Sequence, residues 1–368
     1  MLLVACWQWA TVTANYRGNF TALFCTGALQ RQTPLTASEH LYLFANSTGY
    51  DGQFYHYVAH DPFLRTRLKT YVDDARLRYR RILIPLLAYG LALGQSKLID
   101  PAYGLVCLLS IGLGVYWSCR FAQNVKLAAA WGLLFLAMPA IPIAVDRLVT
   151  DGALAALTVA FLYYSRTPSW KLFLVLVCAS LTRETGLLLV LAYCMHLAWR
   201  REFRMAGLFL LSVIPTVAWY GYLKAKIPGN SLGMSLMPFA GVLRAIRNPW
   251  TYPAGTLFAQ AVRVADYLAL AGMLLAFALV LIWFARRPDD PSAIATMLFT
   301  AMALMMNYPD PWPNVYHYGR GYTPVLVCLS GIAAQYRKPW LLAPVAMILP
   351  RIAIQLAPQA LGILRWIA

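Results

Sequence analysis

One carboxylate among aromatic side chains is the feature of this sequence best suited to chemistry. Asp51 lies in the run Gly-Tyr-Asp-Gly-Gln-Phe-Tyr-His-Tyr at 49–57, within a polar segment of a largely apolar chain. Ionisable groups next to lipid are costly to keep and are typical of functional sites. The alternative is that Asp51 only caps a short interfacial helix that opens at Gln53.

The side chains around Asp51 suggest two further roles. Tyr50 and Tyr55 suit either the membrane interface or a wall on which a sugar ring stacks. His56 and His60 are four positions apart, which places both imidazoles on one helix face. With the nearby Asp61 they are candidate ligands of a divalent metal. The alternative is a pair of solvated histidines, so the sequence alone assigns no cofactor.

A charged stretch at 73–81 leads from the polar segment into the next apolar run. Asp74 and Arg78 have the spacing of a helical ion pair. Arg80 and Arg81 lie where a lipid phosphate would meet the chain, and they are candidate contacts for such a group. The alternative is that these arginines only anchor a helix end.

Charged residues also interrupt or join the later apolar runs. Asp146 and Asp151 flank a short turn. The alternative to a functional role is that Arg147 and Asp151 pair only with each other. Arg183 and Glu184 interrupt an apolar stretch, and charged residues in such a place are typical of a functional site. The alternative is a helix hairpin that Arg183 and Glu184 stabilise by pairing with each other. The proline-rich loop at 308–320 is expected to be rigid and irregular, and it presents two further candidates, His317 and Arg320.

The composition identifies the chain as a membrane protein. Of its 368 residues 60% are hydrophobic and 12% charged, and the mean hydropathy is +0.58. The apolar runs are continuous, so we predict an all-α polytopic protein. The net charge of +17 does not indicate nucleic acid, because much of it lies in short loops between apolar runs. The seven cysteines lie mostly in or near apolar runs and do not indicate a redox compartment.

About twelve spans are expected. The first run, 1–14, is short and lacks a basic n-region and a cleavage site, so we interpret it as an anchor rather than as a cleaved signal peptide. The other expected spans are 82–97, 101–119, 126–145, 152–165, 170–182, 185–199, 205–223, 263–285, 292–307, 322–335 and 339–356. We expect one transmembrane domain over 1–368, with outer loops at 16–81 and 224–262 and no separate soluble domain.

The orientation of the chain follows from its basic loops. Arginine and lysine occupy every second connection in the later part of the chain, at 166–171, 200–204, 286–287 and 337–338. The positive-inside rule places these four loops in the cytoplasm and the acid-bearing connections outside. The segment 16–81, with five of the fourteen acidic residues, joins that outer face only if 82–97 does not cross the membrane. That stretch is short and contains Pro85, so we interpret it as a partial or re-entrant helix.

The order of these motifs resembles the bacterial membrane glycosyltransferases of the GT-C superfold that use polyprenyl-phosphate sugars. The matching parts are 50–56, 73–81, 146–151 and 182–186, within the first two thirds of the chain. His56 departs from the tyrosine of the subgroup's YDGQFYY-type motif.

The resemblance implies a bundle of about 10–13 transmembrane helices, with interfacial helices in the first outer loop. It also implies an inverting transfer in which Asp51 is the general base. The donor is a lipid-linked sugar and the acceptor an extracytoplasmic glycan or glycolipid of the cell envelope. The expected location is the bacterial cytoplasmic membrane, with the site facing the periplasm or exterior.

In this scheme the candidate contacts of the donor are Arg80, Arg81, Arg183, His317 and Arg320. Asp146, Asp151 and Glu184 are further candidate carboxylates. Membrane lipid and a partner subunit are expected partners, and a divalent metal is a candidate cofactor. Two alternatives are a transporter or flippase of a lipid-linked sugar and a non-catalytic subunit of an envelope assembly complex.

Overall fold

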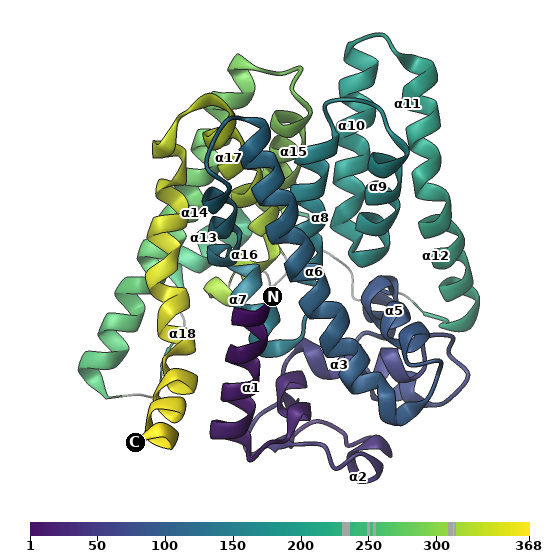
Figure 1. Ribbon diagram of the computed structural model, residues 1–368, viewed down its shortest axis with the longest axis vertical. Helices are drawn as coiled ribbons and strands as arrows, with labels where there is room; N and C mark the ends of the chain where they lie inside the picture. Colours follow the sequence, from purple (N-terminus) through teal and green to yellow (C-terminus); the bar gives the residue numbers. More distant parts are fainter. Residues whose placement is uncertain (230–235, 249–250, 253–254, 308–311, 313) are drawn as a thin grey trace.

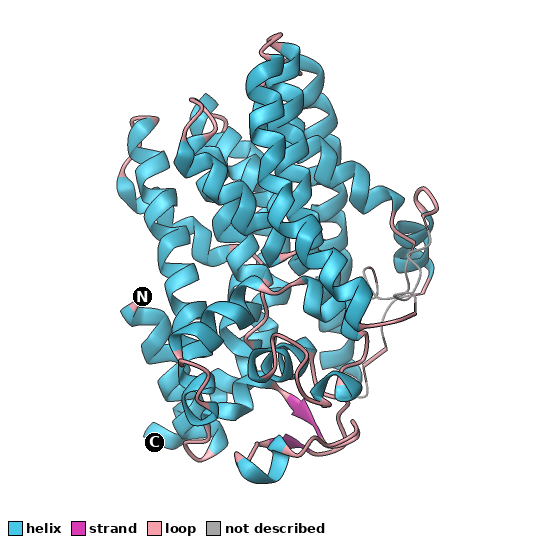
Figure 2. Ribbon diagram, turned by 90° about the vertical axis from the view of Figure 1, so that its right-hand side faces the viewer, coloured by secondary structure: helices cyan, strands magenta, loops and turns pink. Residues whose placement is uncertain are grey.

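Helices form nearly all of the regular structure in this computed structural model, which describes residues 1–229, 236–248, 251–252, 255–307, 312 and 314–368. Within these residues the only strands are β1 (Thr26–Gly27) and β2 (Leu43–Phe44), which pair in parallel near the foot of the molecule (Figure 2). The fold is all-α, as the continuous apolar runs predict.

Four helices in the described part of the chain are long and apolar enough to cross a membrane. A fifth span results if a bent pair of helices is counted as one. The long helices are α6 (Ser96–Asn124), the continuous α11 (Phe203–Leu210), η5 (Leu211–Val213) and α12 (Ile214–Lys226), then α14 (Thr256–Arg286), and η6 (Pro339–Leu342) with α18 (Ala343–Ile367). The chain is therefore a multi-pass membrane protein.

Five shorter apolar helices of 10–17 residues fill the bundle between the long ones. One of them, α8 (Asp151–Tyr164), is buried along most of its length because it packs on α6, α9 (Trp170–Thr182) and α17 (Thr323–Tyr336). The five shorter helices occupy the predicted spans 152–165, 170–182, 185–199, 292–307 and 322–335. These helices are α8 (Asp151–Tyr164), α9 (Trp170–Thr182), η4 (Glu184–Gly186) with α10 (Leu187–Trp199), α15 (Pro291–Met305) and α17 (Thr323–Tyr336).

Two predicted spans differ in the structure. The stretch 82–97 contains α5 (Leu83–Leu91), which is about 13 Å long and covers less than half of a hydrocarbon core. This helix is too short to cross, as the sequence suggested. The stretch 126–145 is not one helix, because η3 (Ala129–Ala137) and α7 (Ala140–Arg147) meet at a bend of 64° next to Pro139.

The basic loops lie together at one end of the bundle. Arg337 donates to the carbonyls of Val125 and Lys126, at 3.1 and 2.7 Å. At the same end the guanidinium of Arg166 lies over the ring of Phe121. Figure 1 shows the α10–α11 connection at this upper end and α2 (Leu35–Ser38) and α3 (Asp51–His60) at the lower end. The first loop is therefore remote from the basic face, and the positive-inside rule predicts that it is extracytoplasmic.

The first loop is a folded layer at the lower end, between α1 (Leu2–Tyr16) and α6. Its helix α3 is buried from Gly52 to Ala59 and packs on α5 and α6. The remaining elements of the loop are η1 (Phe20–Phe24), η2 (Leu68–Tyr71) and α4 (Ala75–Arg80). Two short helices complete the description, α13 (Ala240–Arg247) and α16 (Val315–Gly321).

Candidate functional site

The start of α3 is held in place by the residues on either side of Asp51. The side chain of Gln53 accepts from the Gly27 N–H at 3.2 Å and donates to the Thr48 carbonyl at 2.9 Å. A Cβ atom on Gly52 would lie 2.2 Å from the Arg147 carbonyl oxygen, so only glycine fits there. The helix begins at Asp51 itself, with Tyr50 at the N-cap, and the prediction that Asp51 caps a helix opening at Gln53 is wrong.

Asp51 is bound by two arginines. Its Oδ2 lies 3.0 Å from Arg78 Nη1 and 2.8 Å from Arg320 Nη2. Arg78 also forms a bidentate pair with Asp73, at 2.9 and 2.6 Å. Burial alone would raise the pKa of the Asp51 carboxyl, but Arg78 and Arg320 hold that pKa well below its usual range. Asp51 is therefore ionised in this state.

A second set of ion pairs lies beside the first. Arg81 binds Glu184 through Nε at 3.0 Å and Nη2 at 2.5 Å, and it donates to the Tyr55 hydroxyl at 2.8 Å. Arg183 pairs with Asp151, whose other oxygen lies 3.6 Å from Arg320 Nε. We call Arg78, Arg81, Arg183 and Arg320 the arginine cluster.

Distant segments supply the arginine cluster, and local sequence explains each position. Arg183 has an extended backbone and breaks the apolar stretch between α9 and η4. The turn closes tightly at Gly186, where a Cβ would lie 2.0 Å from the Ala179 carbonyl oxygen. Asp151 is in the first turn of α8, a position that favours a carboxylate. Arg320 is in the last turn of α16.

Several polar atoms of the site lack a partner among the described residues. Nη1 of Arg320 and the hydroxyls of Tyr50 and Thr185 are buried without a hydrogen bond. Nε of Arg320 is too far from Asp151 to donate a hydrogen bond. Buried donors without acceptors indicate a place for ligand oxygens.

Burial and, after it, the neighbouring Arg81 lower the pKa of Arg183 to about 10. Each arginine of the cluster is paired with a carboxylate. The side chains of Asp51 and Glu184 are 19% and 22% exposed, so the cluster is accessible from outside the bundle.

Other candidate residues lie elsewhere or play different parts. Arg80 lies over the ring of Tyr220, away from the ion pairs. Asp146 pairs with Arg147 at 3.2 Å, so the expected exclusive pairing of Arg147 with Asp151 is wrong. Arg183 and Glu184 contact each other at 3.9 Å, as the self-paired alternative expects, but their closer partners are Asp151 and Arg81.

The loop at 308–320 is only partly described. Residues 308–311 and 313, which include all three prolines of the loop, lie outside the described residues. The part from Val315 to Gly321 is helical, so the expectation of an irregular loop fails there. The Nδ1–H of His317 donates to Asn314 Oδ1 at 2.9 Å. Burial and Arg320 lower the pKa of His317 to about 4, and it is neutral at ordinary pH.

The two tyrosines of the predicted aromatic wall differ. Tyr55 is fully buried, and the Arg78 guanidinium lies 5.6 Å from its ring centre, so no sugar reaches this ring. Tyr50 is half-buried, and the Arg320 guanidinium lies over its ring, 5.0 Å from the ring centre. Tyr50 thus remains the candidate for contact with a substrate.

His56 and His60 come together, but Asp61 does not join them. The Asp61 carboxylate accepts from the backbone N–H groups of Arg65 and Thr66, both at 2.7 Å. His56 is fully buried, so the alternative of solvated histidines is wrong. The facing carboxylates belong to Glu39 and Asp100, which were not candidates from the sequence.

Arg78 is the other functional residue that the motif analysis passed over in favour of Arg80. A signal was available, since Arg78 and Arg81 are three positions apart and share a helix face that Arg80 does not. In the structure this face carries the two arginines toward Asp51 and Glu184.

A groove of about 850 Å³ runs between α12 and the first loop. It is lined by Phe63, Trp219 and Tyr222, with Arg65 and Lys226 among its other residues. Trp219 donates to the Tyr79 carbonyl and Tyr222 to the Phe63 carbonyl, which holds α12 on the loop.

Comparisons with known proteins give limited information. No protein-family model matches the chain, and no curated protein matches it. Among solved structures, the crystal structure of ArnT from Cupriavidus metallidurans in the apo state is similar, with 20% sequence identity and a TM-score of 0.45. The match covers 77% of this chain and 55% of the length of that one. The function must therefore be argued from the residues of the site.

Proposed function

We propose that the chain is a membrane glycosyltransferase of the GT-C type that moves a sugar from a polyprenyl-phosphate carrier to an envelope glycan or glycolipid. The pairing of Asp51 with Arg78 and Arg320, beside the ion pairs of Arg81 and Arg183 and at the end of the bundle remote from the basic loops, carries this proposal. A cluster of guanidiniums with unsatisfied donors suits a phosphate oxyanion. Its position suits a donor whose lipid tail stays in the bilayer.

The groove along α12 offers a path for such a tail. Its aromatic lining and its nearby Arg65 and Lys226 combine an apolar surface with positive charge. Arg80 lies over Tyr220 of the same helix and keeps the role of a contact for an approaching phosphate. The groove and the arginine cluster are joined by α4, which supplies Arg78 and packs on α12.

The proposed reaction is a single displacement. The acceptor hydroxyl oxygen attacks the anomeric carbon, and the bond from that carbon to the phosphate oxygen breaks with its electron pair leaving on the phosphate. Asp51 takes the hydroxyl proton, and the arginine cluster stabilises the charge that develops on the leaving phosphate. Attack opposite the leaving group inverts the anomeric carbon.

Donor binding makes Asp51 a better base. While Arg78 and Arg320 bind it, the low pKa of Asp51 makes it a weak proton acceptor. A donor phosphate competes for these guanidiniums and brings its own negative charge, and both effects raise the pKa of Asp51. The base is therefore activated when the donor is in place, which limits unproductive chemistry without it.

The remaining parts of the proposal follow from the position of the site. The protein belongs in the bacterial cytoplasmic membrane, with Asp51 on the extracytoplasmic side, where envelope acceptors are found. A partner subunit that presents the acceptor is compatible with this arrangement. The further carboxylates Asp151 and Glu184 position arginines, whereas Asp146 lies outside the arginine cluster and has no part in the transfer.

Proteoliposomes separate this function from transport of a lipid-linked sugar. Purified protein is reconstituted with a panel of short-chain polyprenyl-phosphate sugars and a mixture of envelope glycans and glycolipids. We expect release of free polyprenyl phosphate and appearance of the sugar on an acceptor. Movement of intact donor across the bilayer, with no sugar transferred, would establish a flippase instead. If no combination of donor and acceptor gives either activity, the result would favour a non-catalytic subunit.

A further inference from the structure

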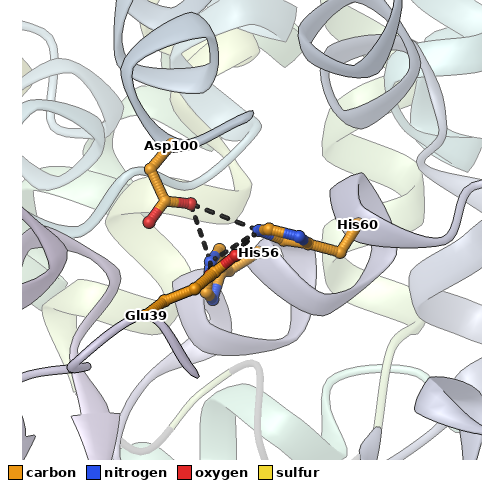
Figure 3. Close-up of side chains that lie close together, drawn as sticks. All are labelled: Glu39, His56, His60 and Asp100. Carbon is orange, nitrogen blue, oxygen red and sulfur yellow. Dashed lines mark hydrogen bonds and ion pairs between the residues drawn. The ribbon is translucent and has the colours of Figure 1, made fainter. Parts of the chain in front are cut away.

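A second group of ionisable side chains lies on another part of α3. His56 and His60 point from successive turns of this helix toward Glu39, which follows α2, and Asp100, in the first turns of α6 (Figure 3). One ligand atom from each of the four side chains lies within 4.8 Å of all the others. Three separate segments of the chain thus present two imidazole nitrogens and two carboxylate oxygens to one point.

The distances between these atoms match the edges of a tetrahedral metal site. Nε2 of His60 lies 3.1 Å from Nε2 of His56, 3.3 Å from Glu39 Oε2 and 3.4 Å from Asp100 Oδ1. His56 Nε2 lies 3.5 Å from Glu39 and 2.7 Å from Asp100. A tetrahedron with metal–ligand bonds of about 2.1 Å has edges of about 3.4 Å. Of the five separations given, the 2.7 Å between His56 and Asp100 departs most from that edge.

The chemistry of the group calls for a cation. Neutral imidazole nitrogens and carboxylate oxygens all present lone pairs, so their convergence is stabilised either by a proton on an imidazole or by a metal ion. Glu39 Oε2 is buried and has no hydrogen-bond donor among the described residues. The side chains of His56 and His60 are 0% and 3% exposed, so water does little to separate these groups.

Neighbouring residues already orient the ligands. The Ser96 hydroxyl donates to Glu39 Oε1 at 2.6 Å and lies 3.2 Å from His60 Nδ1. The ring of His56 stacks on Phe24, with 4.3 Å between ring centres. Such contacts turn the ligating atoms inward before the ion arrives, as outer-shell groups do in metal sites.

We propose that Glu39, His56, His60 and Asp100 bind a divalent transition-metal ion, with Zn²⁺ as the ion that fits best. Two imidazoles disfavour Mg²⁺ and Ca²⁺, which prefer sites built from oxygen alone. Four protein ligands fill a tetrahedral shell and leave no open position for a substrate, which is typical of structural zinc. The ion fastens α3 and the loop after α2 to α6, and thereby positions Asp51 at the other end of α3. This site does not depend on the transferase function.

The metal content of the purified protein tests the proposal directly. The protein is purified through a tag without histidine, incubated with Zn²⁺, freed of excess ion and analysed by inductively coupled plasma mass spectrometry. We expect one equivalent per chain in the wild type. We expect at least a tenfold lower content in His60→Ala and in Asp100→Asn. His40→Asn is the matched control, because His40 is exposed in the same loop and asparagine tolerates its positive φ of 50°.

Two further measurements keep the outcome decisive if a variant folds poorly. Cobalt(II) added to metal-free wild-type protein should give the strong visible absorption of tetrahedral Co²⁺, and Zn²⁺ should abolish it. A chelator should lower the thermal unfolding midpoint of the wild type, and Zn²⁺ should restore it. Wild-type protein that retains no ion above the level of His56→Ala/His60→Ala would overturn the proposal. One equivalent of zinc in both the wild type and His56→Ala/His60→Ala would also overturn the proposal.

Discussion

Arg320 donates to Asp51 at 2.8 Å, although 269 positions separate the two residues along the chain. This contact joins the start of α3 in the first loop to the end of α16. Arg78 binds the same carboxylate oxygen of Asp51. Two guanidiniums on one oxygen leave other donors of Arg320 without a partner among the described residues. An incoming anion can therefore accept hydrogen bonds from the donors of Arg320 that Asp51 does not occupy.

Removal of the Arg320 guanidinium should weaken binding of a lipid phosphate. A charge-assisted hydrogen bond contributes about 1.5–3 kcal/mol, so we expect Arg320→Gln to raise the dissociation constant of short-chain polyprenyl phosphate about tenfold to a hundredfold. Binding is measured by microscale thermophoresis in detergent. Arg286→Gln is the control, because Arg286 is exposed at the basic end of the bundle. Equal affinities of the two variants would show that the arginine cluster does not bind the phosphate.

The acid sensitivity of the protein should report the ionisation of Asp51. Its folded-state pKa is lowered, so its contribution to stability is complete above the unfolded pKa of about 3.9 and is lost as pH falls through the folded pKa. We expect the difference in thermal midpoint between wild type and Asp51→Asn to stay constant from about pH 7 to 5 and to shrink below about pH 4. A difference that closes between about pH 7 and 5 would indicate a raised pKa instead.

The ion pair of Arg81 and Glu184 should matter for stability much more than an exposed pair. Glu184→Ala leaves the buried Arg81 without its carboxylate, which we expect to cost about 3 kcal/mol. Glu202→Ala breaks a pair with Arg200, which is 57% exposed, and should cost about 0–1 kcal/mol. Denaturant unfolding in micelles measures both. Similar losses for the two variants would contradict the buried network.

The first loop and the basic loops should face opposite sides of the membrane. Ser38 is exposed in the first loop and Asp289 is exposed at the basic end. In a background without native cysteines, an impermeant thiol reagent added to intact spheroplasts should label Ser38→Cys and spare Asp289→Cys. Permeabilised cells should show labelling of both. Labelling of Asp289→Cys alone in intact spheroplasts would place Asp51 in the cytoplasm and contradict the use of an extracytoplasmic acceptor.

Local sequence was sufficient to locate Asp51, Arg183 and Glu184, because a charge that interrupts apolar sequence or stands among aromatics has a high cost without a partner. It was also sufficient for the helical class and for the short reach of the stretch at 82–97. The partners of these charges were harder to find. Arg183 pairs most closely with Asp151, far along the chain, whereas its contact with the neighbouring Glu184 is longer, at 3.9 Å.

The proposed metal ligands were also only partly predictable from local sequence. The spacing of His56 and His60 is local and could be recognised, whereas Glu39 and Asp100 reach them only through the packing of α3 on α6. Asp100 did offer a signal, as an acid at the start of an apolar span next to Pro101. The choice of Asp61 failed because its carboxylate binds the backbone of the following turn.

The rate of sugar transfer by Asp51→Asn tests the proposed role of Asp51 most directly. Asparagine keeps the size of the side chain but cannot accept the hydroxyl proton, so we expect the rate of polyprenyl phosphate release to fall by about 10²–10⁴. Asp289→Asn, at the opposite end of the bundle, should keep the wild-type rate. Transfer by Asp51→Asn at the wild-type rate, in protein that binds polyprenyl phosphate normally, would contradict the assignment of Asp51 as the base.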